Sequence, residues 1–242
     1  MRRFFVPPDS LCQDTVLLSG ETLHHLAVVL RLVPGDEILL LDGSGTFCHC
    51  RIATLGKGDG RAEVVRRWQE AETALPIHLL QGLPKSDKLE LVLQKGTELG
   101  IGLFSPLHTE RTVPRLTASR EDQRRQRWQK IIREAARQCQ RSRLPALMPV
   151  RSLKDGLEQC DEELRLMLWE EESRPLADVL PATPPRNTAI LVGPEGGFSP
   201  AEAAAARRAG FLPVRVGPRI MRSETAGFAV AAILQYLYGD LG

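Results

Sequence analysis

The pattern of hydrophobic and polar positions divides the chain into two parts. Through roughly the first seventy residues, short apolar or alternating runs lie between glycine turns such as Asp42-Gly43 and Asp59-Gly60. Runs of this length with a period of two are typical of strands, and close spacing of such strands is typical of a small β-barrel. The strands expected here are residues 15–18, 37–41, 47–52 and 62–67.

From Ile77 onward, strand-length apolar runs alternate with segments of helical period. This alternation predicts an α/β domain with a mainly parallel sheet. A helix is expected over residues 87–99, ending at Gly100. With residues 70–76 as a linker, the pattern predicts one domain at residues 1–72 and a second at residues 73–242. The strands expected in the second domain are residues 77–81, 103–107, 147–149, 164–169, 189–192 and 213–216.

One strand, loop and helix unit begins with the apolar run at residues 189–192. Three glycines open the loop that follows, and a helix then begins with Ser199 as N-cap, Pro200 at its first position and Glu202 placed for a capping box. Glycines let backbone groups approach a flat ligand, although a plain tight turn would use the same residues. The spacing matches neither the dinucleotide fingerprint nor the phosphate-binding P-loop. The glycines are Gly193, Gly196 and Gly197.

A second unit of the same plan begins near Val214 and adds charge. Arg219, Arg222 and Glu224 lie between its strand and an apolar final helix expected over residues 225–238. Ligands bind at the carboxyl ends of strands in open α/β sheets, so both loops are candidate ligand loops. The final helix is apolar nearly all round, which predicts burial in the core or against another subunit.

Charge is distributed unevenly along the chain. Residues 111–143 contain eleven Lys or Arg and three acids, a local charge of +8. Because the whole chain has a net charge of +2, the remaining residues together carry −6. A helix from Ser119 is expected to bury a stripe that includes Trp128 and Ile132. A surplus of positive charge on this helix favours contacts with phosphates. The alternative is that the charged side is an ordinary solvated face of a packed helix. The basic residues expected opposite the stripe are Lys130, Arg133, Arg137 and Arg141.

Other classes of protein and site are disfavoured. No stretch approaches the roughly twenty apolar residues of a membrane span, and Pro7-Pro8 interrupts the only apolar run near the start. The cysteine count of five is odd and the residues are scattered, which predicts reduced thiols in the cytoplasm. Cys48-His49-Cys50 looks like a fragment of a metal site but has no second ligand pair, so no metal is expected.

Several segments together resemble a known family. Leu191-Val-Gly-Pro-Glu-Gly-Gly-Phe-Ser199 and Gly217-Pro-Arg-Ile-Met-Arg-Ser-Glu-Thr-Ala226 are similar to the signature loops of the SPOUT-class ribosomal RNA small subunit methyltransferase E family, which methylates uridine at N3. Met221 stands where leucine is usual and still fills an apolar slot. Further matches are Met1-Arg-Arg-Phe-Phe-Val6, His24-His-Leu26, Val29-Leu-Arg-Leu32, Gly35-Asp36, Lys95-Gly-Thr-Glu-Leu-Gly100 and Glu134-Ala-Ala-Arg-Gln-Cys139.

The resemblance implies a PUA-like RNA-binding domain, a SPOUT domain with a trefoil knot, and a homodimer formed through the last helix. It implies S-adenosylmethionine as cofactor and small-subunit ribosomal RNA, or the small ribosomal subunit itself, as partner. Packing at a helix start is the alternative role for His24 and His25. The candidate RNA contacts are Arg2, Arg3, His24, His25, Arg31, Lys88, Lys95 and the basic helix. The expected cofactor residues are Leu191, Val192, Gly193, Pro194, Gly196, Gly197, Val216, Gly217, Ile220, Met221, Thr225 and Ala226.

Methylation at N3 requires a uridine that has lost its N3 proton or whose anion is stabilised. Arg222 and Arg219 are expected to stabilise charge on the uracil carbonyls. Glu195 or Glu224 is expected to accept a proton or to orient an arginine, and a structural ion pair between Arg222 and Glu224 is the alternative. Two other functions stay open: a noncatalytic RNA-binding assembly factor, and a methyltransferase acting on a ribose 2′-hydroxyl or on transfer RNA.

Overall fold

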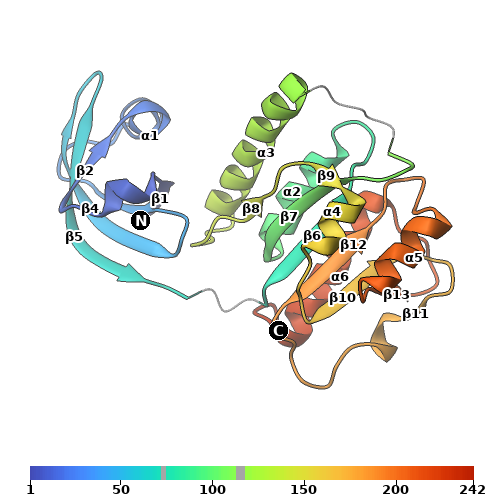
Figure 1. Ribbon diagram of the computed structural model, residues 1–242. Coiled ribbons are helices and arrows are strands. Elements are labelled where there is room, and N and C mark those ends of the chain that lie inside the picture. The colour runs from blue at the N-terminus through green and yellow to red at the C-terminus, as the bar shows by residue number, and fades with distance from the viewer. Residues whose placement is uncertain (72–74, 113–117) are drawn as a thin grey trace. The chain divides into compact units, whose positions relative to one another are not determined.

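Two compact units make up the chain in the computed structural model, which describes residues 1–71, 75–112 and 118–242 (Figure 1). The first unit contains Met1–Glu72 and Ala136–Leu144, and the second contains Thr73–Ala135 and Pro145–Gly242. The first unit therefore includes a later segment that a division of the sequence at residue 72 leaves out.

A five-stranded sheet in the order β1-β3-β4-β5-β2 forms the first unit. β1 pairs with β3 in parallel and the other pairs are antiparallel. β4 and β5 are both longer than expected, and the sequence pattern did not predict β1. The elements are β1 (Arg2–Phe5), η1 (Pro8–Leu11), β2 (Thr15–Leu18), α1 (Gly20–His24), the π-helical turn η2 (His25–Val29), β3 (Glu37–Leu41), β4 (Thr46–Leu55) and β5 (Gly60–Gln69).

The later segment of the first unit is bonded to the sheet and its turns. Arg3 Nη1 donates to the Gln140 carbonyl at 2.7 Å, and the Leu144 amide donates to the Gly43 carbonyl at 2.9 Å. Leu144 also fills the space beside Gly43, where a Cβ would come within 2.7 Å of its side chain. These contacts are long-range, so no local pattern in the sequence could have predicted them.

An eight-stranded sheet in the order β11-β13-β10-β12-β6-β7-β8, with β9 also paired to β7, forms the second unit. All its pairs are parallel, as the alternating pattern predicts. The strand expected at residues 147–149 ends at Leu147, and Pro149 has no N–H for a ladder. The strands are β6 (Ile77–Gly82), β7 (Ile101–His108), β8 (Ala146–Leu147), β9 (Arg151–Ser152), β10 (Leu164–Leu168), β11 (Arg174–Pro175), β12 (Thr188–Val192) and β13 (Leu212–Arg215).

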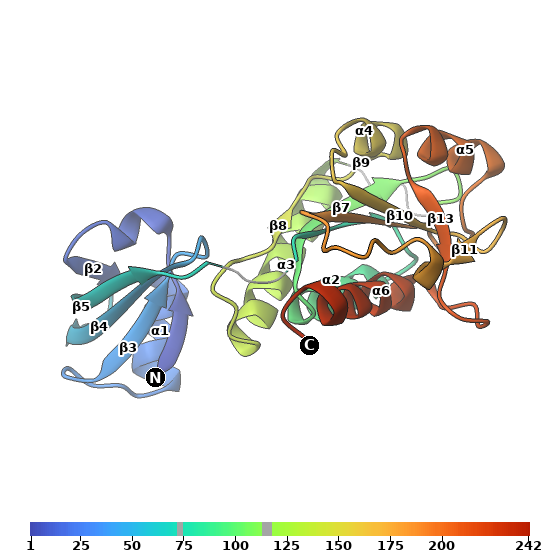
Figure 2. The same ribbon diagram turned by 90° about the horizontal axis from the view of Figure 1, so that it is seen from below.

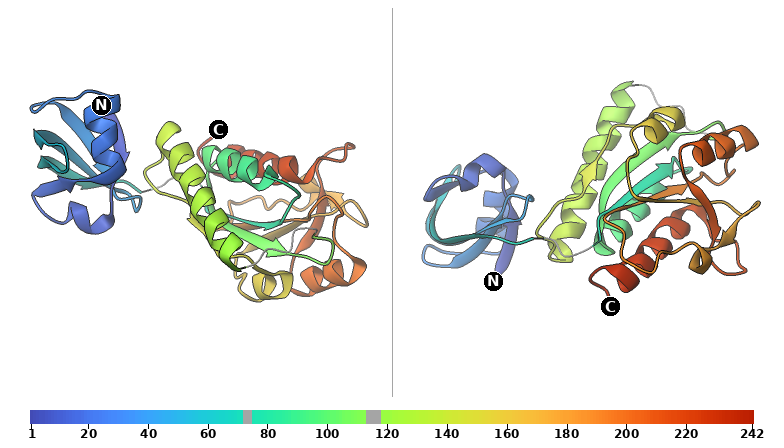
Figure 3. Two further views of the ribbon diagram at one scale, coloured as in Figure 1. Left: turned by 90° about the horizontal axis from the view of Figure 1, so that it is seen from above. Right: turned by 60° about the horizontal axis from the view of Figure 1, so that its bottom comes forward.

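Helices cover both faces of this sheet (Figures 2 and 3). Leu79 and Ile190 belong to the core shared with three helices on one face, and Leu80 and Leu191 belong to the core on the other face. Neighbouring residues of a strand point to opposite faces, so each strand contributes to both cores. The helices are α2 (Lys88–Glu98), α3 (Ala118–Gln138) and α6 (Ser223–Tyr238) on the first face, α4 (Leu153–Glu158) and α5 (Pro200–Arg208) on the second, and the short η3 (Leu176–Asp178).

The two helices singled out in the sequence differ in detail from the expectation. Trp128 and Ile132 of α3 are buried, and Lys130 and Arg133 are exposed, as the stripe predicts. Arg141, however, lies beyond the end of α3 because Gln140 adopts a φ of 64° that ends the helix. Helix α6 begins at Ser223, two residues before the expected start.

The parallel strands bring their carboxyl ends to one edge of the second sheet. β6, β12, β10 and β13 are neighbours there, so the loops that follow them converge on the same place. Within the described residues, no helix has the length and apolar character that a membrane crossing needs.

Candidate functional site

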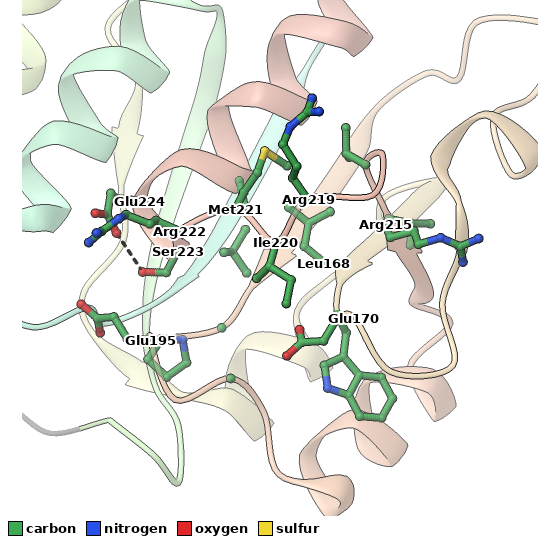
Figure 4. Close-up of a pocket in the computed structure, with 18 of the residues that line it drawn as sticks. Leu168, Glu170, Glu195, Arg215, Arg219, Ile220, Met221, Arg222, Ser223 and Glu224 are labelled. Atoms are coloured by element: carbon green, nitrogen blue, oxygen red, sulfur yellow. Dashed lines mark hydrogen bonds between the residues drawn. The ribbon is translucent and has the colours of Figure 1, made fainter.

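A cavity of about 620 Å³ lies at this edge and is shown in Figure 4. Its walls come from the start of α2 and from the loops that follow β10, β12 and β13. Figure 4 shows Arg222, Ser223 and Glu224 on the side of the cavity where Glu195 lies, with Glu170 across from them. The lining residues are Lys88, Leu168–Glu170, Val192–Glu195, Gly197, Val214–Glu224 and Ala226.

The loop after β12 is held by its own turn and by the helix that follows. Gly197 has a φ of 68°, and its amide donates to the Pro194 carbonyl at 2.9 Å. The Ser199 hydroxyl accepts from the Glu202 amide, and the Glu202 carboxylate accepts from the Ser199 amide, so the expected capping box is present. Glu202 also accepts from the Glu110 amide at 2.7 Å. These bonds fix the direction in which the glycine loop leaves the sheet.

The loop after β13 carries the arginines. Gly217 has a φ of 67°, and a Cβ there would enter open space. The Arg222 carbonyl accepts from the amides of Thr225 and Ala226, which starts α6. In the part of the chain that the structure describes, the guanidinium groups of Arg219 and Arg222 have no ion pair, and both residues are exposed. They are therefore available to a ligand.

Lys88 connects the two acidic residues of the site. Its Nζ lies 3.0 Å from Glu195 Oε1 and 3.3 Å from Glu224 Oε2. Glu195 also accepts from the Lys85 amide at 3.1 Å, and Glu224 accepts from the Ser223 hydroxyl at 3.3 Å. The ion pair considered between Arg222 and Glu224 is therefore replaced by one between Lys88 and Glu224.

These contacts change the acidity of all three groups. Burial alone would raise the pKa of Glu195, but the Lys88 ammonium and backbone amides outweigh it and lower the pKa. The pKa of Glu224 is lowered in the same way, by its own backbone amide, Lys88 and Ser223 acting against burial. The hydrogen bonds to Glu195 and then Glu224 raise the pKa of Lys88. Both carboxylates and the ammonium are thus charged near neutral pH.

Most of the expected cofactor residues line the cavity, but three do not. Leu191 is buried within β12, Thr225 lies in the first turn of α6, and the Gly196 carbonyl accepts from Arg111 Nη1 at 2.7 Å. All four expected catalytic residues, Arg219, Arg222, Glu195 and Glu224, line it.

The lining residues Leu168, Trp169 and Glu170 were not expected. They follow β10, the strand between β12 and β13. The run at residues 164–169 was correctly expected to be a strand, so its carboxyl end was a detectable signal. Lys88, one of the expected RNA contacts, also lines the cavity.

The other candidate RNA contacts lie in different parts of the structure. Arg3 is held by Gln140 and lies 5.7 Å from the Phe47 ring, whereas Arg2 and Arg31 are exposed. Lys95 pairs with Glu98 at 2.9 Å. Lys130 and Arg133 are exposed on α3.

His25 is the first residue of η2 and follows directly on the last residue of α1. Its Nδ1 is 3.3 Å from Arg137 Nη1, and its ring meets Phe4 edge to face. Burial, followed by the charges of Arg137 and Arg2, lowers the pKa of His25. Its ring therefore favours the neutral form.

Potential metal ligands meet away from the cavity. His78, Cys160 and Glu162 have ligand atoms within 4.8 Å of one another at the amino ends of β6 and β10. His78 Nδ1 lies 2.6 Å from Glu162 Oε1, and the Cys160 thiol donates to Glu162 Oε2 at 2.7 Å. The hydrogen bonds from His78 and Cys160 outweigh burial and hold the pKa of Glu162 at about 2.

The earlier metal-like fragment, Cys48-His49-Cys50, points in two directions. Cys48 and Cys50 are buried, while His49 lies 2.9 Å from the exposed Glu37. Its three side chains therefore do not converge on one point.

Comparison with known proteins accounts for both units. Residues 71–235 match a family described as the RNA methyltransferase domain, and residues 18–65 match one described as the RNA methyltransferase PUA domain. The first unit is therefore PUA-like, and the second is an α/β RNA methyltransferase domain.

Several relatives that share one name are similar to this protein over nearly the whole chain. Ribosomal RNA small subunit methyltransferase E of Mycobacterium bovis is 35% identical over 215 residues, covering 87% of this chain and 82% of that protein. The Bacillus subtilis protein of that name is 32% identical over 231 residues, covering 92% and 90%. The crystal structure of the Neisseria gonorrhoeae protein of that name, bound to S-adenosyl methionine, has a TM-score of 0.89, 33% identity and coverage of 100% of both chains. The chain belongs to the ribosomal RNA small subunit methyltransferase E family of RNA methyltransferases.

Proposed function

We propose that this protein transfers a methyl group from S-adenosylmethionine to N3 of a uridine in 16S ribosomal RNA of the small subunit. The observation that carries the proposal is the cavity where two glycine-containing loops meet and where two exposed arginines, Arg219 and Arg222, lie. Membership of the family and the cofactor-bound Neisseria gonorrhoeae relative support it. The resemblance of the two signature loops supports N3 of uridine as the target atom.

The cavity fits the cofactor in size and in the character of its walls. Sites for small molecules span roughly 300–1,000 Å³, and this cavity measures about 620 Å³. At Gly197 and Gly217 the space that a Cβ would occupy is open, so a ligand can approach the backbone closely. When bound, S-adenosylmethionine supplies an electrophilic methyl group on its sulfonium.

The cofactor would be held largely by backbone and apolar groups of the two loops. The lining residues proposed for this role are Val192, Gly193, Pro194, Gly197, Val216, Gly217, Ile220, Met221 and Ala226, with Leu191, Gly196 and Thr225 supporting them. Arg222 and Arg219 would stabilise negative charge on the uracil carbonyls, because no acid among the described residues forms an ion pair with their guanidinium groups. Glu195 and Glu224 complete the catalytic set by holding the loops in place.

The RNA backbone would lie on the basic surfaces of each unit. Lys130 and Arg133 are exposed on α3, where they can contact phosphates without reading the base sequence. The further contacts proposed are Arg2, Arg3, His25, Arg31, Arg137 and Arg141 in the first unit and Lys95 in the second.

The last helix would form a homodimer interface. Tyr236 and Leu237 are 66% and 49% exposed on α6, although the helix is mostly apolar, and a second subunit would cover them. Tyr236→Glu is expected to yield monomers in sedimentation, and an unchanged sedimentation coefficient would contradict the dimer.

A trefoil knot in the segment from β12 to α6 is inferred from the family resemblance. A crystal structure in which that segment can be withdrawn without passing through a loop would contradict the knot.

Three simpler features follow from the same proposal. Methyl transfer from a sulfonium needs no Lewis acid, so a chelator is expected to leave activity unchanged. The target RNA places the protein in the cytoplasm, which cell fractionation tests. The domain at residues 1–72 would contribute RNA contacts, and the domain at residues 73–242 would carry the transfer together with the RNA contacts proposed on its own helices.

Labelled S-adenosylmethionine tests the proposal against its alternatives. We expect the protein to bind the cofactor and to label small subunits, and Arg222→Ala to bind the cofactor but lose about 10²- to 10³-fold in rate. Arg208→Ala, on the exposed side of α5, is the matched control. No cofactor binding would favour an assembly factor, and label in a 2′-O-methyl nucleoside or in transfer RNA would favour a different methyltransferase.

A further inference from the structure

The acidic side of the cavity consists of Glu195 and Glu224, and both carboxylates are paired with the same lysine. Lys88 bridges Glu195 and Glu224 through contacts of 3.0 and 3.3 Å. These three side chains come from the start of α2, the loop after β12 and the start of α6. They are partly to largely sheltered, with side-chain exposures of 31%, 27% and 10%. Their mutual attraction is therefore less screened than at an open surface.

Uridine N3 carries the proton that must leave before the nitrogen can attack. An efficient general base has a pKa near the working pH, because it must be deprotonated and still bind a proton well. The Lys88 ammonium stabilises the charged form of both carboxylates, which makes them poor bases for a weakly acidic imide. Lys88 is itself protonated by the same pairing.

We propose that Lys88 locks Glu195 and Glu224 as ionised positioning residues, and that the N3 proton leaves to solvent rather than to a side chain of the protein. This inference rests on the proposed function. Water or hydroxide takes the N3 proton and leaves the electron pair on nitrogen. That pair forms the bond to the methyl carbon, and the carbon–sulfur bond breaks with its electrons returning to sulfur. The products are 3-methyluridine and S-adenosylhomocysteine.

The balance of charge at the cavity supports this route. The acids and bases that line it are Glu170, Glu195, Glu224, Lys88, Arg215, Arg219 and Arg222. Lys88 pairs with two of the three acids, Glu195 and Glu224. The Arg215 guanidinium donates a hydrogen bond to the Ser173 carbonyl, so it is held by the protein. Arg219 and Arg222 remain to stabilise a uridine anion, which lowers the pH at which N3 ionises. Substrate ionisation, assisted by these arginines, therefore replaces a protein base.

Replacing the target uridine by 5-fluorouridine separates the two routes, because fluorine makes N3 more acidic without changing the protein. Single-turnover rates would be measured against pH with reconstituted small subunits that contain either nucleoside. We expect each rate to rise with pH until N3 is ionised, and the midpoint to move to lower pH with 5-fluorouridine. A midpoint that is the same for both substrates and disappears in Glu170→Gln, Glu195→Gln or Glu224→Gln would overturn the proposal.

The role of Lys88 is tested in the free protein, independently of methyl transfer. Carbon-13 NMR of labelled glutamate carboxyls would follow the titration of Glu195 and Glu224 in wild type, Lys88→Met, Lys88→Arg and the exposed control Lys154→Met. We expect both carboxyls to titrate below the ordinary range in wild type, to move up in Lys88→Met, and to be restored in Lys88→Arg. A carboxyl that takes up its proton near neutral pH in wild type would overturn the proposal even if the protein proves to be an active methyltransferase.

Activity gives a third, matched comparison. Lys88→Met is expected to lower the rate about ten- to a hundredfold, because the loops would be misplaced. The midpoint of its pH profile should still be set by the ionisation of uridine N3. Arginine at this position is expected to restore most of the rate. A midpoint that follows the carboxyl pKa in Lys88→Met would contradict the solvent route.

Discussion

The side-chain amide of Gln235 bonds both backbone groups of Leu75. Gln235 Oε1 accepts from the Leu75 amide at 3.0 Å, and Gln235 Nε2 donates to the Leu75 carbonyl at 2.9 Å. Gln235 is fully buried, and its Nε2 also lies 3.3 Å from the Gly100 carbonyl. One polar side chain thus attaches the last helix to the chain entering β6, two residues before that strand begins.

Removing this amide is expected to destabilise the second unit. Gln235→Leu keeps most of the volume but leaves two buried backbone groups of Leu75 without partners, at a cost of about 2–4 kcal/mol. Urea unfolding measures the change, with Gln94→Leu on the exposed side of α2 as the control. A loss no larger than that of the control would contradict the assignment.

The sequence was a good guide to local structure at the site. Ser199, Pro200 and Glu202 formed the expected cap, because capping depends on neighbours within one turn. The parallel α/β sheet could also be predicted, because each of its longer strands has an apolar run of its own in the sequence. Both glycine loops reached the same cavity, because parallel neighbours end at the same edge.

Contacts between distant segments could not be predicted in this way. The pairing of Lys88 with Glu195 and Glu224 was not expected, because these partners lie far along the chain and no period in the sequence relates them to Lys88. The placement of Ala136–Leu144 with the first unit has the same cause. Arg141 was placed on a helix because the residue that ends it, Gln140, carries no helix-ending signal such as glycine.

Trp169 offers a direct signal for ligand binding. It lines the cavity and has the Arg207 guanidinium 5.3 Å from its ring centroid. We expect S-adenosylmethionine to decrease the tryptophan fluorescence in a saturable way, because the adenine would enter the space beside the indole. Trp169→Phe should abolish the signal while calorimetry still detects binding.

The control for this signal is Trp68→Phe. Trp68 belongs to the first unit and stacks on Phe47 with ring centroids 5.3 Å apart. A signal that survives in Trp169→Phe but vanishes in Trp68→Phe would place the ligand elsewhere.

The basic face of α3 predicts a salt-dependent contribution to RNA binding. Arg133 is exposed on this helix, and each phosphate contact contributes about 0.7–0.9 to the slope of log affinity against log salt concentration. Arg133→Ala is therefore expected to weaken binding to small-subunit RNA and to reduce that slope by about this amount. Filter binding over a range of salt concentrations measures both quantities, and Lys154→Ala on α4 is the control. An unchanged slope would assign Arg133 to a solvated face.

The pair of His78 and Glu162 predicts how stability depends on pH. The pKa of Glu162 is held at about 2 in the folded protein, because the hydrogen bonds from His78 and Cys160 outweigh the effect of burial. The group has an ordinary pKa near 4.5 when unfolded, so its contribution is complete above about pH 4.5 and is lost as the pH falls towards 2. The contribution is on the order of 3 kcal/mol.

Comparison of wild type with Glu162→Gln isolates the contribution of Glu162 ionisation to the free energy of unfolding. The free energy of unfolding should fall more steeply in wild type between about pH 4.5 and pH 2, since the variant has no carboxyl to protonate. Glu171→Gln, an exposed acid on the loop after β10, should keep the wild-type slope. Parallel curves for wild type and Glu162→Gln would show that the pair does not stabilise the fold in this way.

We propose that methyl transfer to N3 of a uridine in small-subunit RNA takes place at this cavity. The most direct test is to incubate the purified protein with unmodified small subunits and S-adenosylmethionine, digest the RNA to nucleosides, and separate the methyluridines by chromatography with mass detection. We predict one new product, 3-methyluridine, at no more than one per subunit and sharply reduced with Arg222→Ala. A product that co-elutes with 2′-O-methyluridine, or no product despite measured cofactor binding, would contradict the claim.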